Sequence, residues 1–366
     1  MGRRRHDDDE DDEPSTDGDD WIEWGGELVF AVDFTPGGAP IGLTREEWRA
    51  ENLRYRARRG WARAYAVLET TLRKAAPDAE LDIGRVRKRG EGLSRDSYGA
   101  YVELTPDPGE LSDLYIVRLP RPDADDDLQA RTYREAELLW RLAELELPFR
   151  IPQVLSVVPE RHGPAMVQRA VEGLELDRDG APWKVVGPVA AQVHAIEVDR
   201  VRALVAEVHG SARAHVLSEL SELEGDASPE LRDAAAWAAA HAPGEDVPAR
   251  LLHGDLLPQN IHASPPDPPS VIDWEYAKVG DPAYDLAIVT RGVRRPFKVA
   301  GGLEKLVDAY RNAGGAPSVS PQAVQVHELC MLGGWYRGEL EDTTRRPTGQ
   351  PLNRLRALLK RLRPSV

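Results

Sequence analysis

Two kinds of hydrophobic pattern follow one another along the chain. In the first half, short runs of apolar, β-branched and aromatic residues are bounded by glycine and proline, which is typical of β-strands. These runs are Ile83–Arg87, Tyr98–Leu104, Leu114–Leu119, Val154–Val158 and Ala165–Arg169. Beyond Pro182 the apolar residues recur at helical spacing instead. The predicted helices there are Val185–Glu197, Arg200–Leu223 and Pro229–His241, and a further predicted helix, Asp126–Leu145, interrupts the strands.

Strands first and helices afterwards predict an α+β chain with a small antiparallel-sheet lobe and a larger helical lobe. We assign residues 81–170 to the smaller lobe and residues 171–366 to the larger one. Residues 21–80 are predicted to form an N-terminal extension, with a strand at Glu27–Phe34 followed by a long helix. Residues 1–20 are acidic and nearly free of apolar side chains, so we expect a disordered tail.

Composition excludes several classes of protein. With 366 residues, 41% of them hydrophobic, the chain can bury a sizeable core. It has no uninterrupted apolar run of about 18 residues, so no membrane span is predicted. The basic start runs directly into acidic residues and lacks the apolar segment of a secretory signal. A single cysteine, Cys330, excludes an internal disulfide and favours a cytoplasmic protein, where thiols stay reduced.

The chain is strongly acidic. Its formal net charge is −15, and residues 1–20 carry about −7 of it, because ten acidic residues face three arginines there. The rest of the chain stays acidic, which disfavours nucleic acid as a partner. Such a charge most often serves to keep a protein soluble, and the alternative is long-range attraction of a cationic substrate.

The most informative feature is a set of three polar residues in the second half of the chain. Asp255 and Asn260 are five residues apart with Pro258 between them, so they belong to a loop and not to a helix. A carboxylate there can accept a proton from an attacking hydroxyl group, and the amide oxygen can bind a divalent cation. Asp273 lies thirteen residues beyond Asn260, after the apolar run Ser270–Ile272. A carboxylate at the end of a buried strand suits Mg²⁺, whose coordination substrate phosphates then complete.

Each of these residues has an ordinary structural explanation when it is taken alone. Asp255 is then a turn residue, Asn260 a loop amide, and Asp273 an acid that ends a strand or caps a helix. Their combination at these spacings, with a further acidic motif at Gly280–Asp285, favours a catalytic site.

These motifs resemble those of the aminoglycoside phosphotransferase family, which includes macrolide-kinase and choline-kinase-like relatives. The resemblance rests on His253-Gly254-Asp255 with Asn260, on Ile272-Asp273-Trp274, and on Gly280-Asp281-Pro282 with Asp285. It extends over about Leu81 to Leu359 and implies a two-lobed protein-kinase-like fold.

The resemblance also implies roles for the residues of the larger lobe. Asp255 is then the catalytic base, or the carboxylate that orients the acceptor hydroxyl group. Asn260 and Asp273 are the Mg²⁺ ligands, and ATP is the phosphoryl donor. Asp285 braces the catalytic loop, and His253 is a hydrogen-bonded brace of the same loop.

In the smaller lobe the resemblance implies a nucleotide site. Gly90, Gly92 and Ser94 lie between two predicted strands, where the family has a loop that covers the phosphates, although a glycine-rich hairpin turn would look the same. Arg118 stands where the protein-kinase pattern has lysine, and arginine can also bind phosphate. Glu135 matches the glutamate that pairs with this cation.

Two further segments carry weaker signals. Gln168 and Ala170 lie at the predicted junction of the lobes, where the resemblance implies that backbone groups face the adenine. The basic cluster Arg291–Arg295 follows the last acidic motif. A solvated surface is its more common explanation, and a substrate contact is the alternative.

The sequence therefore predicts an ATP- and Mg²⁺-dependent phosphotransferase that acts on a hydroxyl group of a small molecule. The resemblance suggests an aminoglycoside or a macrolide, and hence antibiotic resistance; a metabolite such as choline, homoserine or an amino sugar is the alternative. A protein substrate is disfavoured, because no Ala-Pro-Glu motif follows Asp273. A catalytically idle regulatory protein on the same fold is a third hypothesis, suggested only by the unusual Arg118.

Overall fold

The chain divides into two compact units, residues 1–66 and residues 67–366. The computed structural model describes residues 21–24, 27–34, 40–44, 60–91, 95–121, 127–176, 181–223, 228–341 and 348–363. The predicted disordered tail, residues 1–20, lies outside the described residues, and so does the first part of the helix predicted within residues 21–80.

The first unit contains a three-stranded antiparallel sheet with the order β1-β2-β3. Its strands are β1 (Trp21–Trp24), β2 (Glu27–Phe34) and β3 (Pro40–Thr44). The strand predicted at Glu27–Phe34 is confirmed as β2. Helix α2 (Gly60–Ala75) begins in this unit and continues into the second, within the predicted helical stretch.

The second unit begins with an antiparallel sheet of six strands, in the order β4-β6-β7-β9-β8 with β5 also pairing with β6. The strands are β4 (Glu80–Ile83), β5 (Arg87–Glu91), β6 (Arg95–Thr105), β7 (Asp113–Pro120), β8 (Val154–Glu160) and β9 (Gly163–Arg169). The predicted strand Ile83–Arg87 is wrong, because Ile83 ends β4 and Arg87 begins β5. The chain leaves the strand at Gly84, whose backbone lies against Tyr101 of β6. The other predicted strands are confirmed, with ends shifted by a few residues.

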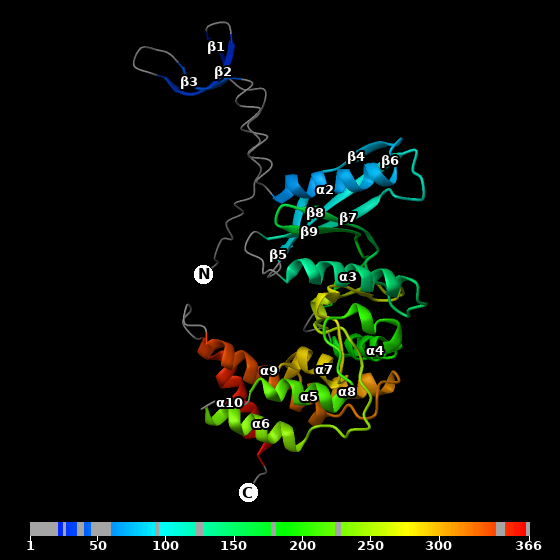
Figure 1. Ribbon diagram of the computed structural model, residues 1–366, viewed down its shortest axis with the longest axis vertical. Helices are drawn as coiled ribbons and strands as arrows, with labels where there is room; N and C mark the ends of the chain where they lie inside the picture. Colours follow the sequence, from blue (N-terminus) through cyan, green and yellow to red (C-terminus); the bar gives the residue numbers. More distant parts are fainter. Residues whose placement is uncertain are drawn as a thin grey trace. The chain divides into compact units, whose positions relative to one another are not determined.

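Helix α3 (Leu128–Ala143) packs against this sheet and confirms the helix predicted at Asp126–Leu145 (Figure 1). Its buried face repeats every three or four residues: Leu128, Thr132, Glu135, Ala136, Leu138, Leu139 and Leu142. Glu135 is therefore a carboxylate on an otherwise largely apolar helix face. A buried carboxylate needs cationic or hydrogen-bonding partners, which the sheet supplies.

The remaining helices form the lower part of the second unit in Figure 1. They are α4 (Trp183–His194), α5 (Ala212–Ser221), α6 (Pro229–Ala240), α7 (Ala283–Thr290), α8 (Gly302–Asn312), α9 (Pro321–Glu341) and α10 (Gln350–Leu362). The predicted helix Arg200–Leu223 is wrong in its first half, where 3₁₀ turns end at Leu204 and an irregular segment with a single β-bridge at Val208 follows. The α-helix starts later because Ser211 caps it, its hydroxyl oxygen accepting the N–H of Ala214. Within the described ranges, no helix is long and apolar enough to cross a bilayer.

Short strands between the sheet and the helices carry the motifs singled out in the sequence. Strand β11 (Arg250–Leu252) pairs with β14 (Lys278–Gly280), and β12 (Ile261–Ala263) lies between β10 (Leu174–Glu175) and β13 (Ser270–Val271). One apolar core cluster includes Leu139 of α3, Val193 of α4, Leu251 of β11, Trp274 and Leu286 of α7. The loops between these strands are therefore anchored on a shared core.

Candidate active site

The loop that follows β11 depends on a glycine. Gly254 has φ +85°, a conformation that residues with a side chain rarely adopt. A Cβ atom at this position would lie 2.0 Å from the carbonyl oxygen of Tyr276. Only glycine lets the loop pass this close to the neighbouring backbone, directly before Asp255.

Asp285 is hydrogen-bonded to the backbone of this loop. One of its carboxylate oxygens accepts the backbone N–H of His253, and the other accepts that of Gly254, each at 2.9 Å. His194 lies 3.0 Å from the same carboxylate through Nε2. Burial alone would raise the pKa of Asp285, but His194, His253 and the N–H of Gly254 together outweigh it and the pKa is lowered. The predicted bracing role of Asp285 is thus matched by two backbone hydrogen bonds, and His194 supports it.

His253 links the loop to the strand that carries Asp273. Its Nδ1 accepts the backbone N–H of Asp255 at 3.3 Å, so the ring proton sits on Nε2. Nε2 lies 2.9 Å from the carbonyl oxygen of Ile272 and donates to it. His253 also packs against Trp274, with ring centroids 4.7 Å apart. Both ring nitrogens are occupied in this way, which fits a brace and not a base.

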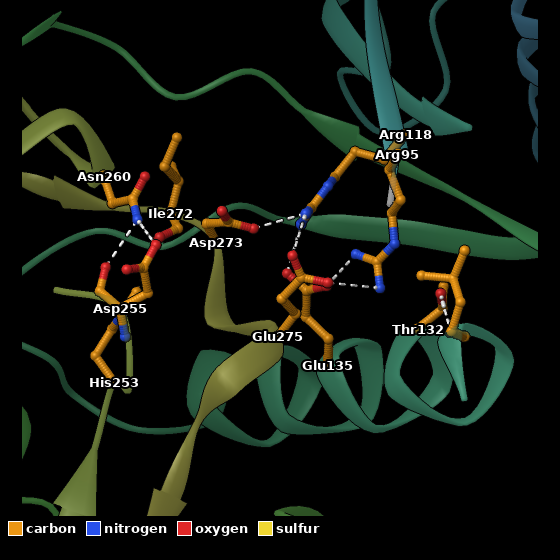
Figure 2. Close-up of polar contacts among 11 residues, drawn as sticks. Arg95, Arg118, Thr132, Glu135, His253, Asp255, Asn260, Ile272, Asp273 and Glu275 are labelled. Carbon is orange, nitrogen blue, oxygen red and sulfur yellow. Dashed lines mark hydrogen bonds and ion pairs between the residues drawn. The ribbon is translucent and has the colours of Figure 1, made fainter. Parts of the chain in front are cut away.

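Asp255 and Asn260 are in direct contact. Asn260 Nδ2 donates to the backbone oxygen of Asp255 at 2.8 Å and to its carboxylate Oδ2 at 3.0 Å (Figure 2). Burial raises the pKa of Asp255, and the neighbouring Asp273 carboxylate adds to this effect, against the lowering influence of His253. A carboxylate with a raised pKa is a stronger base than an exposed aspartate.

Asp273 lies beside this pair in a strained backbone conformation. The Ile272 N–H donates to the Asn260 carbonyl oxygen at 2.9 Å. This bond joins the start of β12 to the end of β13, so Asn260, just before β12, and Asp273, just after β13, come close together. Asp273 has φ 69° and ψ 59°, the left-handed region that aspartate adopts only occasionally. Such strain often marks a functional position, because the surrounding structure must hold it in place.

The oxygen atoms available here fit a divalent cation. Because Asn260 Nδ2 is bonded to Asp255, its amide oxygen is the atom left for a metal. Asp273 uses Oδ1 for Arg118, which leaves Oδ2. In the part of the chain that the structure describes, no three of the side chains His, Cys, Asp and Glu converge as a metal cage. Two protein ligands completed by substrate phosphates are what Mg²⁺ commonly uses.

Arg118 connects this pair to the sheet. Its Nη1 donates to Glu135 Oε1 at 2.6 Å and its Nη2 donates to Asp273 Oδ1 at 2.6 Å (Figure 2). Arg118 and Glu135 therefore lie together as the sequence predicts. Burial alone would raise the pKa of Asp273, but Arg118, His253 and Arg95 together outweigh it and the pKa is lowered.

Two residues of this network were missed in the sequence. Arg95, the first residue of β6, donates through Nη1 to Glu135 Oε2 at 2.6 Å. Glu275, two residues after Asp273, lies 3.5 Å from Arg95 Nη2 and 3.9 Å from Arg118 Nη2. The signal for Arg95 is its register: it lies two residues before Ser97, the β6 partner of Arg118, and so on the same face of the sheet.

The remaining predicted nucleotide residues are only partly described. Gly90 belongs to β5 beside an irregularity in the pairing with β6, whereas Gly92 and Ser94 lie outside the described residues. Gln168 lies in β9, and the Ala170 N–H beyond it donates to the carbonyl oxygen of Leu114 at 2.8 Å. That N–H is therefore occupied within the protein, and the predicted adenine contact of this segment stays a prediction.

The sequence model of the phosphotransferase enzyme family matches residues 102–321. No curated protein matches the chain significantly. Among solved structures, a macrolide 2′-phosphotransferase from Brachybacterium faecium is similar with 23% identity and a TM-score of 0.55, over 82% of this chain and 99% of that one. APH(2″)-IIIa, solved with GDP and kanamycin, has 17% identity and a TM-score of 0.57, over 81% and 99% of the two chains.

A protein from Ralstonia eutropha to which aminoglycoside phosphotransferase activity has been assigned is also similar. It has 15% identity and a TM-score of 0.55, over 81% of this chain and 95% of that one. At identities this low, the structural similarity establishes the fold alone. The predicted α+β, two-lobed fold is therefore confirmed.

Proposed function

The chain belongs to the phosphotransferase enzyme family, and from this we propose that it transfers the γ-phosphoryl group of ATP to a hydroxyl group of a small molecule in the presence of Mg²⁺. The observation that carries the proposal is the contact of Asp255 with Asn260 beside Asp273. Within this scheme we assign nucleotide binding to residues 81–170, and catalysis and acceptor binding to residues 171–366.

Asp255 is the proposed catalytic residue. Its carboxylate accepts or orients the proton of the acceptor hydroxyl group, so that the oxygen can attack the γ-phosphorus. The hydrogen bond from Asn260 fixes the carboxylate, and Asp285 fixes the loop backbone on which it stands. This double support suits a reaction that depends mainly on positioning.

Asn260 and Asp273 are the proposed Mg²⁺ ligands, through the amide oxygen of one and the free carboxylate oxygen of the other. Bound there, Mg²⁺ would neutralise negative charge on the transferred phosphoryl group. Arg118 is the proposed cation for the nucleotide phosphates, since it is the basic residue bonded to both Glu135 and Asp273. Its two terminal nitrogens suit paired phosphate oxygens.

A cationic side chain, that of Arg291, lies beside Asp255, where we place the acceptor. Arg291 Nη2 lies 3.9 Å from Asp255 Oδ1, and the Arg291 guanidinium lies 5.8 Å from the ring centroid of the half-exposed Trp335. A guanidinium at this point repels an ammonium group beside the reacting hydroxyl. It favours an acceptor with a neutral or anionic neighbouring group, such as a sugar or a hydroxy acid. This observation supports the metabolite alternative over an aminoglycoside, despite the acidic composition of the chain.

An ATP-consumption screen tests the proposal. The acceptor panel holds aminoglycosides, macrolides, choline-like amines, sugars and hydroxy acids, each tried with the full chain and with Asp255→Ala. Turnover that depends on one acceptor and is lost in Asp255→Ala supports a kinase. Nucleotide binding without turnover on any acceptor, unaffected by Asp255→Ala, supports an idle regulatory protein instead. Absence of any nucleotide binding contradicts both.

A further inference from the structure

Two arginines from neighbouring strands converge on one glutamate. Arg118 pairs with Ser97 across β7 and β6, and Arg95 lies two residues before Ser97, so both side chains leave the same face of the sheet. They meet Glu135 on α3 from two sides (Figure 2). Each oxygen of the Glu135 carboxylate has its own guanidinium, Oε1 from Arg118 and Oε2 from Arg95, both at 2.6 Å.

Arg118 is shared between two carboxylates. One terminal nitrogen is bonded to Glu135 and the other to Asp273, both at 2.6 Å. To grip paired phosphate oxygens with both terminal nitrogens, as proposed, the Arg118 guanidinium has to turn away from at least one of these carboxylates. A buried carboxylate that loses its cation is strongly destabilised, because burial disfavours its charge.

Arg95 can take over these carboxylates. It is the most deeply buried guanidinium of the network, with a side chain only 2% exposed, and Glu135 is 1% exposed. Besides its bond to Glu135, its Nη2 faces Glu275 Oε2 at 3.5 Å. Arg95 Nε and Nη2 and Glu275 Oε2 are buried without a hydrogen-bond partner in the described part of the chain. Arg95 therefore has unused N–H donors beside the carboxylates that Arg118 would leave, and a small movement would close its contact with Glu275.

We propose that Arg95 is a positioning residue of the nucleotide site, which neutralises Glu135 and Glu275 so that Arg118 is released to bind the nucleotide phosphates. The proposal rests on the proposed function, because it needs a nucleotide at this site. Two arginines then take the two roles that one lysine has in the protein-kinase pattern. Arg95 pairs with Glu135 on the helix, and Arg118 binds the nucleotide phosphates.

Equilibrium binding of Mg²⁺ with ADP or a non-hydrolysable ATP analogue, measured by calorimetry on the full chain, tests this role. We expect Arg95→Met to weaken binding by about tenfold or more, a typical coupling between charged residues in contact. Arg95→Lys, which keeps the charge, is expected to lose less. The matched control is Arg141→Met, at an exposed position of α3, the helix that carries Glu135; this variant should bind like the unmodified chain. Thermal unfolding of each variant shows whether it is folded.

A double-mutant cycle separates positioning from a merely structural effect. If Arg95 acts through Arg118, Arg95→Met should add little further loss in an Arg118→Met background. Glu135→Gln, which removes the charge that holds Arg118, should restore part of the binding in Arg95→Met. Equal losses with and without Arg118, or unchanged binding in Arg95→Met, would overturn the proposal. Absence of nucleotide binding in the unmodified chain would instead overturn the proposed function.

Discussion

His194 Nε2 lies 3.0 Å from Asp285 Oδ2, the oxygen that also accepts the backbone N–H of His253. Through this contact, the end of α4 is bonded to the loop that carries Asp255. The other ring nitrogen of His194 lies 3.0 Å from the hydroxyl group of Tyr310 on α8. The position of Asp255, the proposed catalytic residue, is therefore supported by a series of buried polar contacts that runs from its loop through Asp285 and His194 to α8.

Replacement of Asp285 by alanine is expected to disrupt this chain of contacts. The N–H groups of His253 and Gly254 and the ring of His194 would all lose a buried acceptor. We expect the free energy of unfolding to fall by about 3 kcal/mol or more. Urea denaturation followed by circular dichroism measures this change. Asp267→Ala, at an exposed surface position, is the control and should change stability little.

Asp255→Asn is expected to lower kcat by about 10²–10⁴-fold, the contribution of a positioned acid–base group. The amide keeps the shape of the side chain but is a far weaker proton acceptor, so nucleotide affinity should stay close to that of the unmodified chain. Steady-state kinetics with an acceptor from the screen and calorimetry with Mg²⁺–ADP give the two quantities. Equal losses in both would identify Asp255 as a structural residue.

Asp273→Ala is expected to abolish the effect of Mg²⁺ on nucleotide binding and turnover. The variant removes one proposed metal ligand but frees one side of Arg118, so binding of ADP without metal should be retained. Calorimetric titrations with Mg²⁺ and with a chelator measure the difference. Full Mg²⁺-dependent activity in the variant would rule out the metal assignment.

The central motif could be predicted from the sequence because its residues act locally. Asp255 and Asn260 share one loop, and their contact follows from a spacing of five residues around a proline. Asp273 could be predicted because it ends a short apolar strand. For the same reason most strands of the sheet were predicted, since their pattern depends on nearby residues.

Beyond the predicted pair of Arg118 and Glu135, the rest of this network depends on distant parts of the chain and was harder to predict. Arg95 at the start of a strand looks like an ordinary exposed arginine until the pairing of β6 with β7 fixes its face. The helix predicted at Arg200–Leu223 failed for a related reason. Its composition suits a helix, but Ser211 starts the actual helix and the preceding residues form short turns packed on the core.

Arg291→Met is expected to shift the acid limb of the pH–rate profile to higher pH. Burial already raises the pKa of Asp255, and the Arg291 guanidinium counteracts this increase. Without that positive charge the pKa rises further. A base works when it is deprotonated, so the variant should lose activity at a higher pH than the unmodified chain as the pH falls. Profiles of kcat/KM measured in parallel would show this shift, and superimposable profiles would contradict it.

The last prediction concerns stability at alkaline pH. His327 on α9 is buried between two carboxylates, bonded to Glu219 and 3.2 Å from Asp281 Oδ2. Burial alone would lower its pKa, but Glu219 and Asp281 outweigh burial and raise the pKa of His327 to about 10. Asp281 in turn accepts the N–H of Ala283, at the start of α7. A protonated His327 therefore stabilises the helix that carries Asp285.

Because the pKa of His327 is higher in the folded chain than in the unfolded one, its contribution is complete below the ordinary histidine pKa of 6.5 and is lost as the pH rises toward about 10. We expect the free energy of unfolding to decrease over this range, and His327→Gln to remove most of that decrease while lowering stability at pH 6. Urea denaturation at a series of pH values measures both effects. His241→Gln, at a partly exposed histidine outside this cluster, is the control. An equal dependence on pH in His327→Gln would show that other groups are responsible.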